Sequence, residues 1–256
     1  MKPHGSFAEY GIAWAHTTFP LPDTTSYEEG AAIPLAALTS CVGLYARLRL
    51  PQPWLPAADE TKIPLVIYGG SSAVGSYAIQ LARRSNVHPI IAVAGKAASH
   101  VEKMIDRSKG DTIIDYRQGD DAVVKGIRSA LGDQKLYHAF DAVSEKGSYQ
   151  NICKVLEGDG AITLVLPGKD YSDIPAGVQK TTTMVGDVHG PLKDFGYVYA
   201  RYLSRGLQEG WFRAQPQEVQ DGGLEGVEGA LRKLKEGKAS AVKYVFRIGD
   251  TPGVGK

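Results

Sequence analysis

Short apolar runs alternate with amphipathic segments between residues 63 and 167. Runs such as PLVIYG (residues 64–69) and HPIIAVAG (residues 88–95) are apolar throughout, which predicts strands buried on both faces. The segment between them, AVGSYAIQLARRS (residues 73–85), places its apolar residues at helical spacing. Strands that alternate with helices are typical of a doubly wound parallel sheet, so the pattern predicts an α/β fold.

The same alternation continues as far as Pro167. It predicts further strands at residues 111–116, 136–143 and 160–167, and helices at residues 98–108, 120–131 and 147–156.

The two ends of the chain are less regular. Residues 7–16 are rich in aromatic and small side chains, which predicts a strand pair or one bent strand. Ser26 and Glu29 have capping-box spacing, which predicts the start of a short helix. Residues 215–223 are expected to form a loop. The remaining predicted elements are helices at residues 35–49, 194–207 and 224–236 and strands at residues 181–189 and 241–248.

The turn between the first strand and helix of this alternation carries a glycine pattern. Residues 70–75 match G-x-G-x-x-G, except that a serine replaces the middle glycine. In that fingerprint the glycines permit a tight turn close to a pyrophosphate, which the helix N-terminus attracts. A glycine-rich turn without a ligand would have the same local sequence, so the strand–helix context carries the prediction. The candidate phosphate-binding residues of this Rossmann sheet are Gly70, Ser71, Ser72, Ala73, Val74 and Gly75.

The end of the next strand indicates which dinucleotide the turn would hold. NAD sites carry an Asp or Glu about 20 residues after the turn, where it binds the ribose 2′-hydroxyl. Here residues 87–101 contain no acidic residue, and Lys96 occupies the corresponding place. A lysine attracts the 2′-phosphate that a carboxylate would repel, so the sequence predicts NADP(H). Ser71, Ser72 and Ser99 would add hydrogen bonds; the alternative for Lys96 is an ordinary solvated lysine.

Composition narrows the classes of partner. The 256 residues include 29 Lys and Arg against 28 Asp and Glu, so the net charge of +1 does not favour binding to nucleic acid or anionic lipid. The most apolar window is short and broken by Pro34, Thr39 and Ser40, and the N-terminus lacks the apolar core of a signal peptide. We therefore expect a soluble, cytoplasmic protein that acts on a small molecule and does not bind a membrane.

The sequence offers little for metal or nucleophile chemistry. The two cysteines, Cys41 and Cys153, form no CxxC pair, and no H-E-x-x-H or G-x-S-x-G motif occurs. Cys41 lies in an apolar helical segment, so we expect a buried thiol rather than a thiolate. The histidines show no metal-ligand spacing: they are His4, His16, His88, His100, His138 and His189. We predict no metal site and assign no catalytic residue.

Five stretches of the chain carry a family resemblance. They are GSFAEY at residues 5–10 and the segments at residues 26–45, 68–82, 111–117 and 216–248. Together they resemble the zinc-independent medium-chain dehydrogenase/reductase superfamily, and within it the fungal trans-acting enoyl reductases of polyketide pathways. The resemblance implies an NADPH-dependent enzyme of secondary metabolism that reduces an enoyl thioester or a quinone-like compound.

The resemblance also implies roles for individual residues. Thr39 matches a threonine that approaches the nicotinamide, and the stretch from Leu164 to Leu166 would lie along the carboxamide. Tyr116, like Lys96, would lie near the adenosine 2′-phosphate, and Lys243 matches a basic position near the cofactor. The alternative for Thr39 is a hydroxyl bonded to its own helix backbone, and Tyr116 could serve packing alone.

The chain departs from the family pattern at its N-terminus. GSFAEY falls near the end of a GroES-like catalytic β-domain in such enzymes, but here it begins at residue 5. The expected organisation is a remnant of that domain at residues 1–30, a Rossmann NADP-binding domain at 31–208, and a helix and strand at 209–256 that return to the remnant. The last strand would then expose an open sheet edge. Three explanations stay open: a truncated product, a homo-oligomer that covers the edge, or a repurposed chain.

Two hypotheses from different functional classes follow. The first is an NADPH-dependent, zinc-independent enoyl reductase or quinone-type oxidoreductase with a small-molecule or carrier-bound substrate. The second is a truncated or repurposed cofactor-domain protein, acting as a binding module or as a non-redox enzyme on a polyketide-derived substrate. Binding and oxidation of NADPH separate the two.

Overall fold

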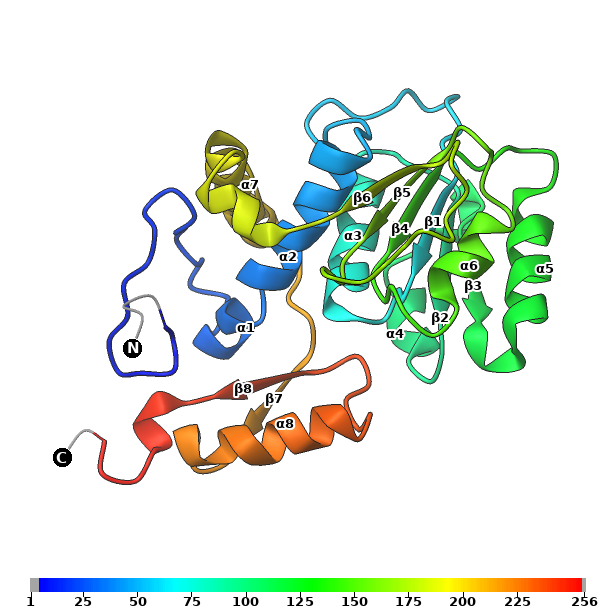
Figure 1. The fold of residues 1–256 in the computed structure, drawn as a ribbon. Coiled ribbons are helices and arrows are strands. Elements are labelled where there is room, and N and C mark those ends of the chain that lie inside the picture. The colour runs from blue at the N-terminus through cyan, green and yellow to red at the C-terminus, as the bar shows by residue number, and fades with distance from the viewer. Residues whose placement is uncertain (1–4, 255–256) are drawn as a thin grey trace. The chain divides into compact units, whose positions relative to one another are not determined.

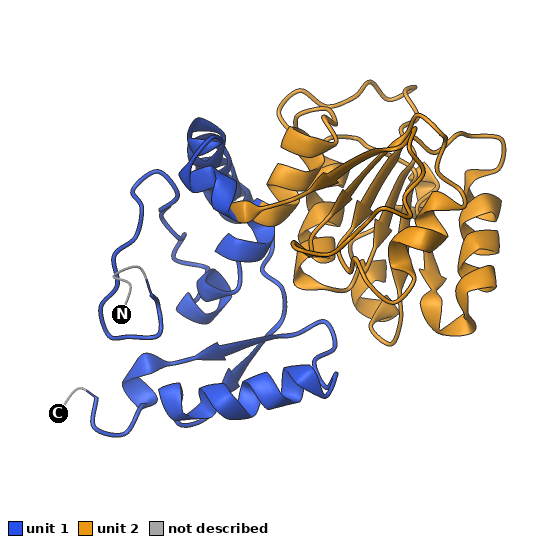
Figure 2. Ribbon diagram, in the orientation of Figure 1, with its two compact units in different colours: residues 1–38, 186–256 blue, residues 39–185 orange. Residues whose placement is uncertain are grey.

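The computed structural model describes residues 5–254, which fall into two compact units (Figure 2). The sheet unit comprises residues 39–185, and the flanking unit comprises residues 5–38 with 186–254. Helix α2 (Pro34–Cys41) spans the junction. The sequence-based boundaries, after residues 30 and 208, differ from these because α7 (Lys193–Glu209) groups with the flanking unit.

The sheet unit is built on six parallel strands in the order β3-β2-β1-β4-β5-β6 (Figure 1). Tyr68 of β1 is in register with Val93 of β2 on one side and with Asp141 of β4 on the other. The chain moves outward from β1 and later returns to β4, so a topological switch point lies between β1 and β4. The predicted doubly wound sheet is confirmed. Its strands are β1 (Leu65–Tyr68), β2 (Ile90–Ala94), β3 (Thr112–Asp115), β4 (His138–Asp141), β5 (Ala161–Leu164) and β6 (Gln179–Thr182).

Helices cover both faces of this sheet, as its fully buried central strands require. On one face, Val66 and Val93 share a core with Ile127 of α5 and Ile152 of α6. The helices of the unit that follow β1 are α3 (Ala73–Arg84), α4 (Ala98–Glu102), α5 (Asp120–Leu131) and α6 (Ser148–Cys153).

A π-helix, Val42–Arg47, continues directly from α2 and packs on the other face of the sheet. Gly43 makes this approach possible, because a Cβ atom there would overlap the ring of Phe140 in β4. The Tyr45 hydroxyl donates to the Leu81 carbonyl of α3 at 3.0 Å. The helix predicted in this region is therefore confirmed, and its widened final part is fixed by packing.

The flanking unit combines helices with a small parallel sheet. The predicted capping box is present: the Ser26 hydroxyl accepts from the Glu29 amide at 3.2 Å, and the Ser26 amide donates to the Glu29 carboxylate at 2.8 Å. In the described chain β7 and β8 pair only with each other, so each strand has an outer edge. The elements are α1 (Tyr27–Ala31), α7, β7 (Gln217–Gln220), α8 (Val227–Lys235) and β8 (Lys243–Phe246).

Several predicted elements are wrong or shorter than predicted. Residues 7–16 form no strand, and a turn follows in which the Thr17 and Thr18 amides donate to the Trp14 carbonyl at 3.1 Å. β7 lies in a segment that the sequence predicts to be a loop. Its residues are polar, and they form a strand by pairing with β8. The helix predicted at 98–108 ends after Glu102, and the strand predicted at 181–189 gives way after Thr182 to a 3-10 turn at Val185–His189.

Replacing Gly43 with alanine is predicted to destabilise the sheet unit by about 1–3 kcal/mol, because the added methyl group would overlap the buried Phe140 ring. Gly158→Ala is the matched control, since no atom lies within 4 Å of a Cβ built there. Urea unfolding followed by circular dichroism measures both. Equal free energies of unfolding for the two variants would contradict the packing described.

Candidate functional site

The glycine turn lies at the carboxyl end of β1, beside the switch point. Gly69 has a φ of +82°, a conformation that favours glycine, and the Gly69 and Gly70 amides both donate to the Val93 carbonyl at 2.9 Å. A Cβ atom on Gly75 would overlap the Gly69 carbonyl oxygen, so only glycine lets α3 begin this close to the turn. Sequence reasoning identified Gly70 and Gly75 but missed Gly69, although paired glycines after a strand are a turn signal.

Ser72 caps the N-terminus of α3. Its hydroxyl accepts from the Gly75 amide at 3.0 Å, and its own amide donates to the Gly69 carbonyl at 2.9 Å. Ser72, which replaces the middle glycine of the fingerprint, therefore serves as the N-cap of α3. The amides of Ala73 and Val74 have no acceptor within the helix, and its first turn carries no acidic residue. These features fit a phosphate group.

Thr39 and Ser40 bring α2 to the same end of α3. Ser40 is fully buried, and its hydroxyl donates to the Val74 carbonyl at 2.7 Å. Thr39 is the adjoining residue and is also buried. The structure therefore gathers Thr39 and the glycine turn in one region.

The carboxyl ends of β2 and β3 form the neighbouring part of the site. The Tyr116 ring lies over Gly95 so closely that a Cβ there would be 2.6 Å from it, yet half of Tyr116 is exposed. Lys96 and Ser99 follow Gly95 and are exposed. Within residues 5–254, neither side chain makes a hydrogen bond or an ion pair. The Lys96 ammonium group is therefore available to an anion.

A carboxylate on β3, that of Asp115, is already paired. The Arg117 Nε donates to its two oxygens at 2.9 and 3.0 Å, and the Arg117 amide donates to one of them at 3.0 Å. The hydrogen bonds from the Arg117 side chain, followed by that from its amide, lower the pKa of Asp115 to about 2. This pair is neutral as a whole, so it leaves the positive charge of Lys96 uncompensated.

The carboxyl ends of β4 and β5 hold a set of polar residues that sequence reasoning missed. The Asp141 carboxylate accepts from the amides of Val143 and Ser144 at 2.9 and 2.8 Å and from the Ser148 hydroxyl at 2.6 Å. Burial raises the pKa of Asp141, and these hydrogen bonds oppose that shift. The Ser144 hydroxyl accepts from the Val165 amide at 2.9 Å, which joins the two strand ends. The only sequence signal for these polar residues is Asp141 at the end of an apolar strand, followed by Ser144 and Gly147.

The remaining predicted cofactor residues belong to different units. Leu164 ends β5 in register with Asp141, and Leu166 follows it partly exposed. Lys243 instead lies in β8 of the flanking unit, where burial lowers the pKa of its ammonium group. All the predicted cofactor residues except Lys243 thus belong to the sheet unit, and their role in binding stays a prediction.

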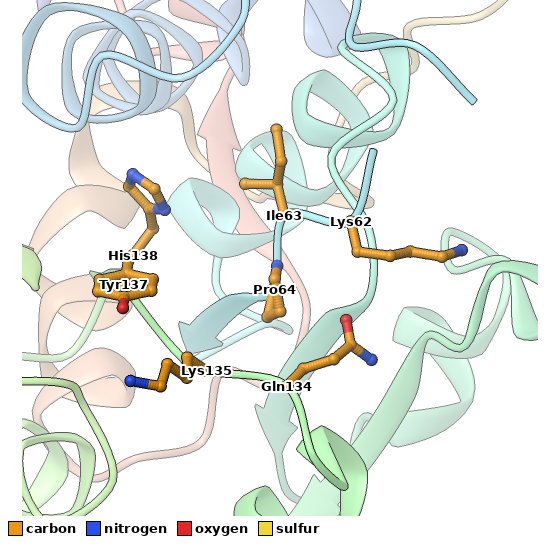
Figure 3. Close-up of a pocket in the computed structure, with 7 residues that line it drawn as sticks. All are labelled: Lys62, Ile63, Pro64, Gln134, Lys135, Tyr137 and His138. Atoms are coloured by element: carbon orange, nitrogen blue, oxygen red, sulfur yellow. The ribbon is translucent and has the colours of Figure 1, made fainter. Parts of the chain in front are cut away.

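A pocket of about 390 Å³ lies at the opposite, amino edge of the sheet (Figure 3). Residues 62–64, which lead into β1, line it together with residues just before and at the start of β4. Lys62 and Lys135 extend away from each other in this view and do not converge on one ligand position. Because ligands of parallel α/β sheets bind outside the carboxyl ends of the strands, the glycine turn is the candidate site.

The described residues hold no metal-binding group, and both thiols have raised pKa values. Among residues 5–254, which exclude His4, no three His, Cys, Asp or Glu side chains are grouped so as to hold a metal ion. Cys41 is fully buried, and burial raises the pKa of its thiol well above the ordinary range. Burial also raises the pKa of Cys153 to about 11. In the same range no helix is long and apolar enough to cross a membrane.

Comparison with known proteins assigns the chain to a family. It is 56% identical to trans-enoyl reductase fsr4 of Gibberella fujikuroi over 226 residues, which cover 88% of this chain and 67% of that protein. It is 31% identical to trans-enoyl reductase tndF of Aspergillus flavipes, over 96% of this chain and 70% of that protein. The chain belongs to the trans-enoyl reductase family. No family model matches the sequence.

Solved structures show the fold of this trans-enoyl reductase family member. JamJ enoyl reductase matches with a TM-score of 0.66 at 16% identity, over 87% of this chain and 64% of that one. CurK enoyl reductase matches with a TM-score of 0.66 at 18% identity, over 88% and 64%. The chain thus spans slightly less than two thirds of these structures. The resemblance to fungal trans-enoyl reductases is confirmed, and the solved structures share the fold.

Both cysteines of the native protein are predicted to resist alkylation at pH 8. A thiol with a pKa of about 11 is ionised in about one molecule in a thousand at that pH, and Cys41 is also shielded from the reagent. Iodoacetamide labelling read by intact-mass spectrometry measures the rate, with urea-unfolded protein as the reference. Rapid labelling of either cysteine in the native protein would contradict their assignment as packing residues.

Proposed function

We propose that the chain is an NADPH-dependent oxidoreductase that reduces the carbon–carbon double bond of an α,β-unsaturated carbonyl compound. The observation that carries the proposal is the Ser72-capped glycine turn at the switch point, in a chain 56% identical to a trans-enoyl reductase. The carbonyl group of an enoyl thioester polarises the double bond, so the β-carbon accepts hydride and the α-carbon accepts a proton.

The charges at the carboxyl ends of β2 and β3 support NADPH as the cofactor. Lys96 is exposed and makes no ion pair in the described chain, whereas Arg117 is bound to Asp115. No acidic residue stands at the end of β2 to bind a ribose 2′-hydroxyl. A 2′-phosphate would therefore meet the Lys96 ammonium group, with the Ser99 hydroxyl and the exposed Tyr116 nearby.

The residues of the sheet unit would divide the binding of the cofactor. When bound, NADPH supplies the hydride, and the protein supplies orientation and exclusion of water. The amides at the start of α3 would hold the pyrophosphate, while Thr39 and the backbone of residues 164–166 would hold the nicotinamide end. Asp141 accepts two hydrogen bonds from the loop after β4 and one from Ser148 at the start of α6, so it orders the backbone at this strand end.

The substrate we propose is an enoyl thioester of fungal polyketide biosynthesis, presented as a small molecule or on a carrier. The names of fsr4 and tndF as trans-enoyl reductases support this class. JamJ and CurK, whose structures share the fold, are also enoyl reductases.

Lys96→Ala is predicted to raise the dissociation constant for NADPH about tenfold and to change that for NADH by less than about twofold, because only NADPH carries the 2′-phosphate. Quenching of tryptophan fluorescence or isothermal titration calorimetry measures both constants. Lys125→Ala, which removes an exposed lysine on α5, is the matched control and should change neither. Equal weakening of NADPH and NADH by Lys96→Ala would refute the phosphate assignment.

The protein is predicted to oxidise NADPH when a short enoyl thioester is added, and to do so faster than with NADH. Absorbance at 340 nm follows the reaction, and mass spectrometry of the saturated thioester confirms the product. Clear NADPH binding with no turnover on thioesters or quinones would overturn the reductase assignment and favour a cofactor-binding module.

A further inference from the structure

The loop after β5 is fastened to the loop after β4 through one residue, Ser144. The Ser144 hydroxyl donates to the Asp141 carbonyl at 3.0 Å and accepts from the Val165 amide at 2.9 Å. The Lys169 ammonium group donates to the Ser144 carbonyl at 3.0 Å. Ser144 has a φ of +60°, so its backbone conformation is one that the surrounding contacts must maintain.

Lys169 is held in a specific environment and is not an ordinary surface lysine. Its Nζ lies 5.0 Å from the ring centroid of Tyr149 and 5.8 Å from that of Tyr171, within reach of cation–π attraction. The two rings meet edge to face with centroids 5.2 Å apart. The Tyr171 hydroxyl donates to the Leu166 carbonyl at 2.8 Å, so Lys169 and Tyr171 fix the same short loop at two points.

These contacts leave one peptide group of the loop without a protein partner. The Leu164 carbonyl accepts from the Thr183 amide at 2.7 Å, and the Val165 amide and Leu166 carbonyl are bonded as described. Within the described residues, the Val165 carbonyl and the Leu166 amide make no hydrogen bond. This peptide bond is trans, so its carbonyl and its amide point in opposite directions. Each offers one hydrogen bond that the amino group or the oxygen of a primary carboxamide can complete.

We propose that Lys169 is a positioning residue for the nicotinamide half of the cofactor. Its ammonium group, bonded to Ser144 and placed against the Tyr149 and Tyr171 rings, holds the Val165–Leu166 peptide in the orientation that receives the carboxamide. This inference rests on the proposed function. It separates the edge of the sheet into two parts: Lys96 acts on the adenosine 2′-phosphate, and Lys169 acts through the loop on the nicotinamide.

Two ligands distinguish this role in calorimetric titrations: NADPH, and adenosine 2′,5′-bisphosphate, which lacks the nicotinamide. Lys169→Met removes the charge at similar length and is expected to weaken NADPH binding about tenfold, while the bisphosphate changes by less than about twofold. Lys169→Arg retains the charge and should recover part of the NADPH affinity. Lys146→Met, on the neighbouring loop and exposed, is the matched control.

Loss of affinity for both ligands to the same extent, or for neither, in Lys169→Met would overturn the positioning role. Thermal unfolding shows whether this variant folds; if it does not, Tyr171→Phe removes the hydroxyl bond to Leu166 and must show the same selective loss for NADPH. A wild-type protein that binds neither ligand would instead refute the proposed function. A wild type that binds both, with no selective loss in either variant, refutes the role of Lys169 alone.

Discussion

The contact between the start of α3 and the turn after β1 is the constraint on which the site depends. No side chain fits on Gly75 beside the Gly69 carbonyl oxygen, and the φ of Gly69 favours glycine. Together they let a helix begin directly at the carboxyl edge of the sheet, with its first amides unsatisfied. The order of the strands then places this helix start at the switch point, where a crevice can accept a dinucleotide.

The two sides of the glycine turn differ in how their charges are arranged. On the β2 and β3 side, Asp115 and Arg117 neutralise each other and leave Lys96 as an available cation. On the β4 and β5 side, the charged groups form hydrogen bonds within the protein. The Asp141 carboxylate accepts from the Ser144 amide, and the Lys169 ammonium group donates to the Ser144 carbonyl. The β2 and β3 side therefore presents a positive charge to a ligand, whereas the β4 and β5 side presents an ordered backbone.

The sequence predicts the parts of this arrangement that depend on local pattern. Buried strands, amphipathic helices and the fingerprint at residues 70–75 are each contained in a short window, so periodicity and spacing reveal them. β7 and the Ser144–Lys169 bond depend on residues distant in the chain, so no local pattern indicates them. The strand expected at residues 7–16 failed for the same reason, because composition supplies a propensity but no pairing partner.

We propose that the dinucleotide binds at the carboxyl edge of the sheet, around the glycine turn. Backbone amide shifts of isotope-labelled protein titrated with NADPH test it directly. We expect the amide signals of Gly70, Gly75, Lys96 and Leu166 to shift together and to saturate with one dissociation constant. Shifts confined to the amino-edge pocket, at Ile63 and Tyr137, with an unchanged glycine turn would contradict it.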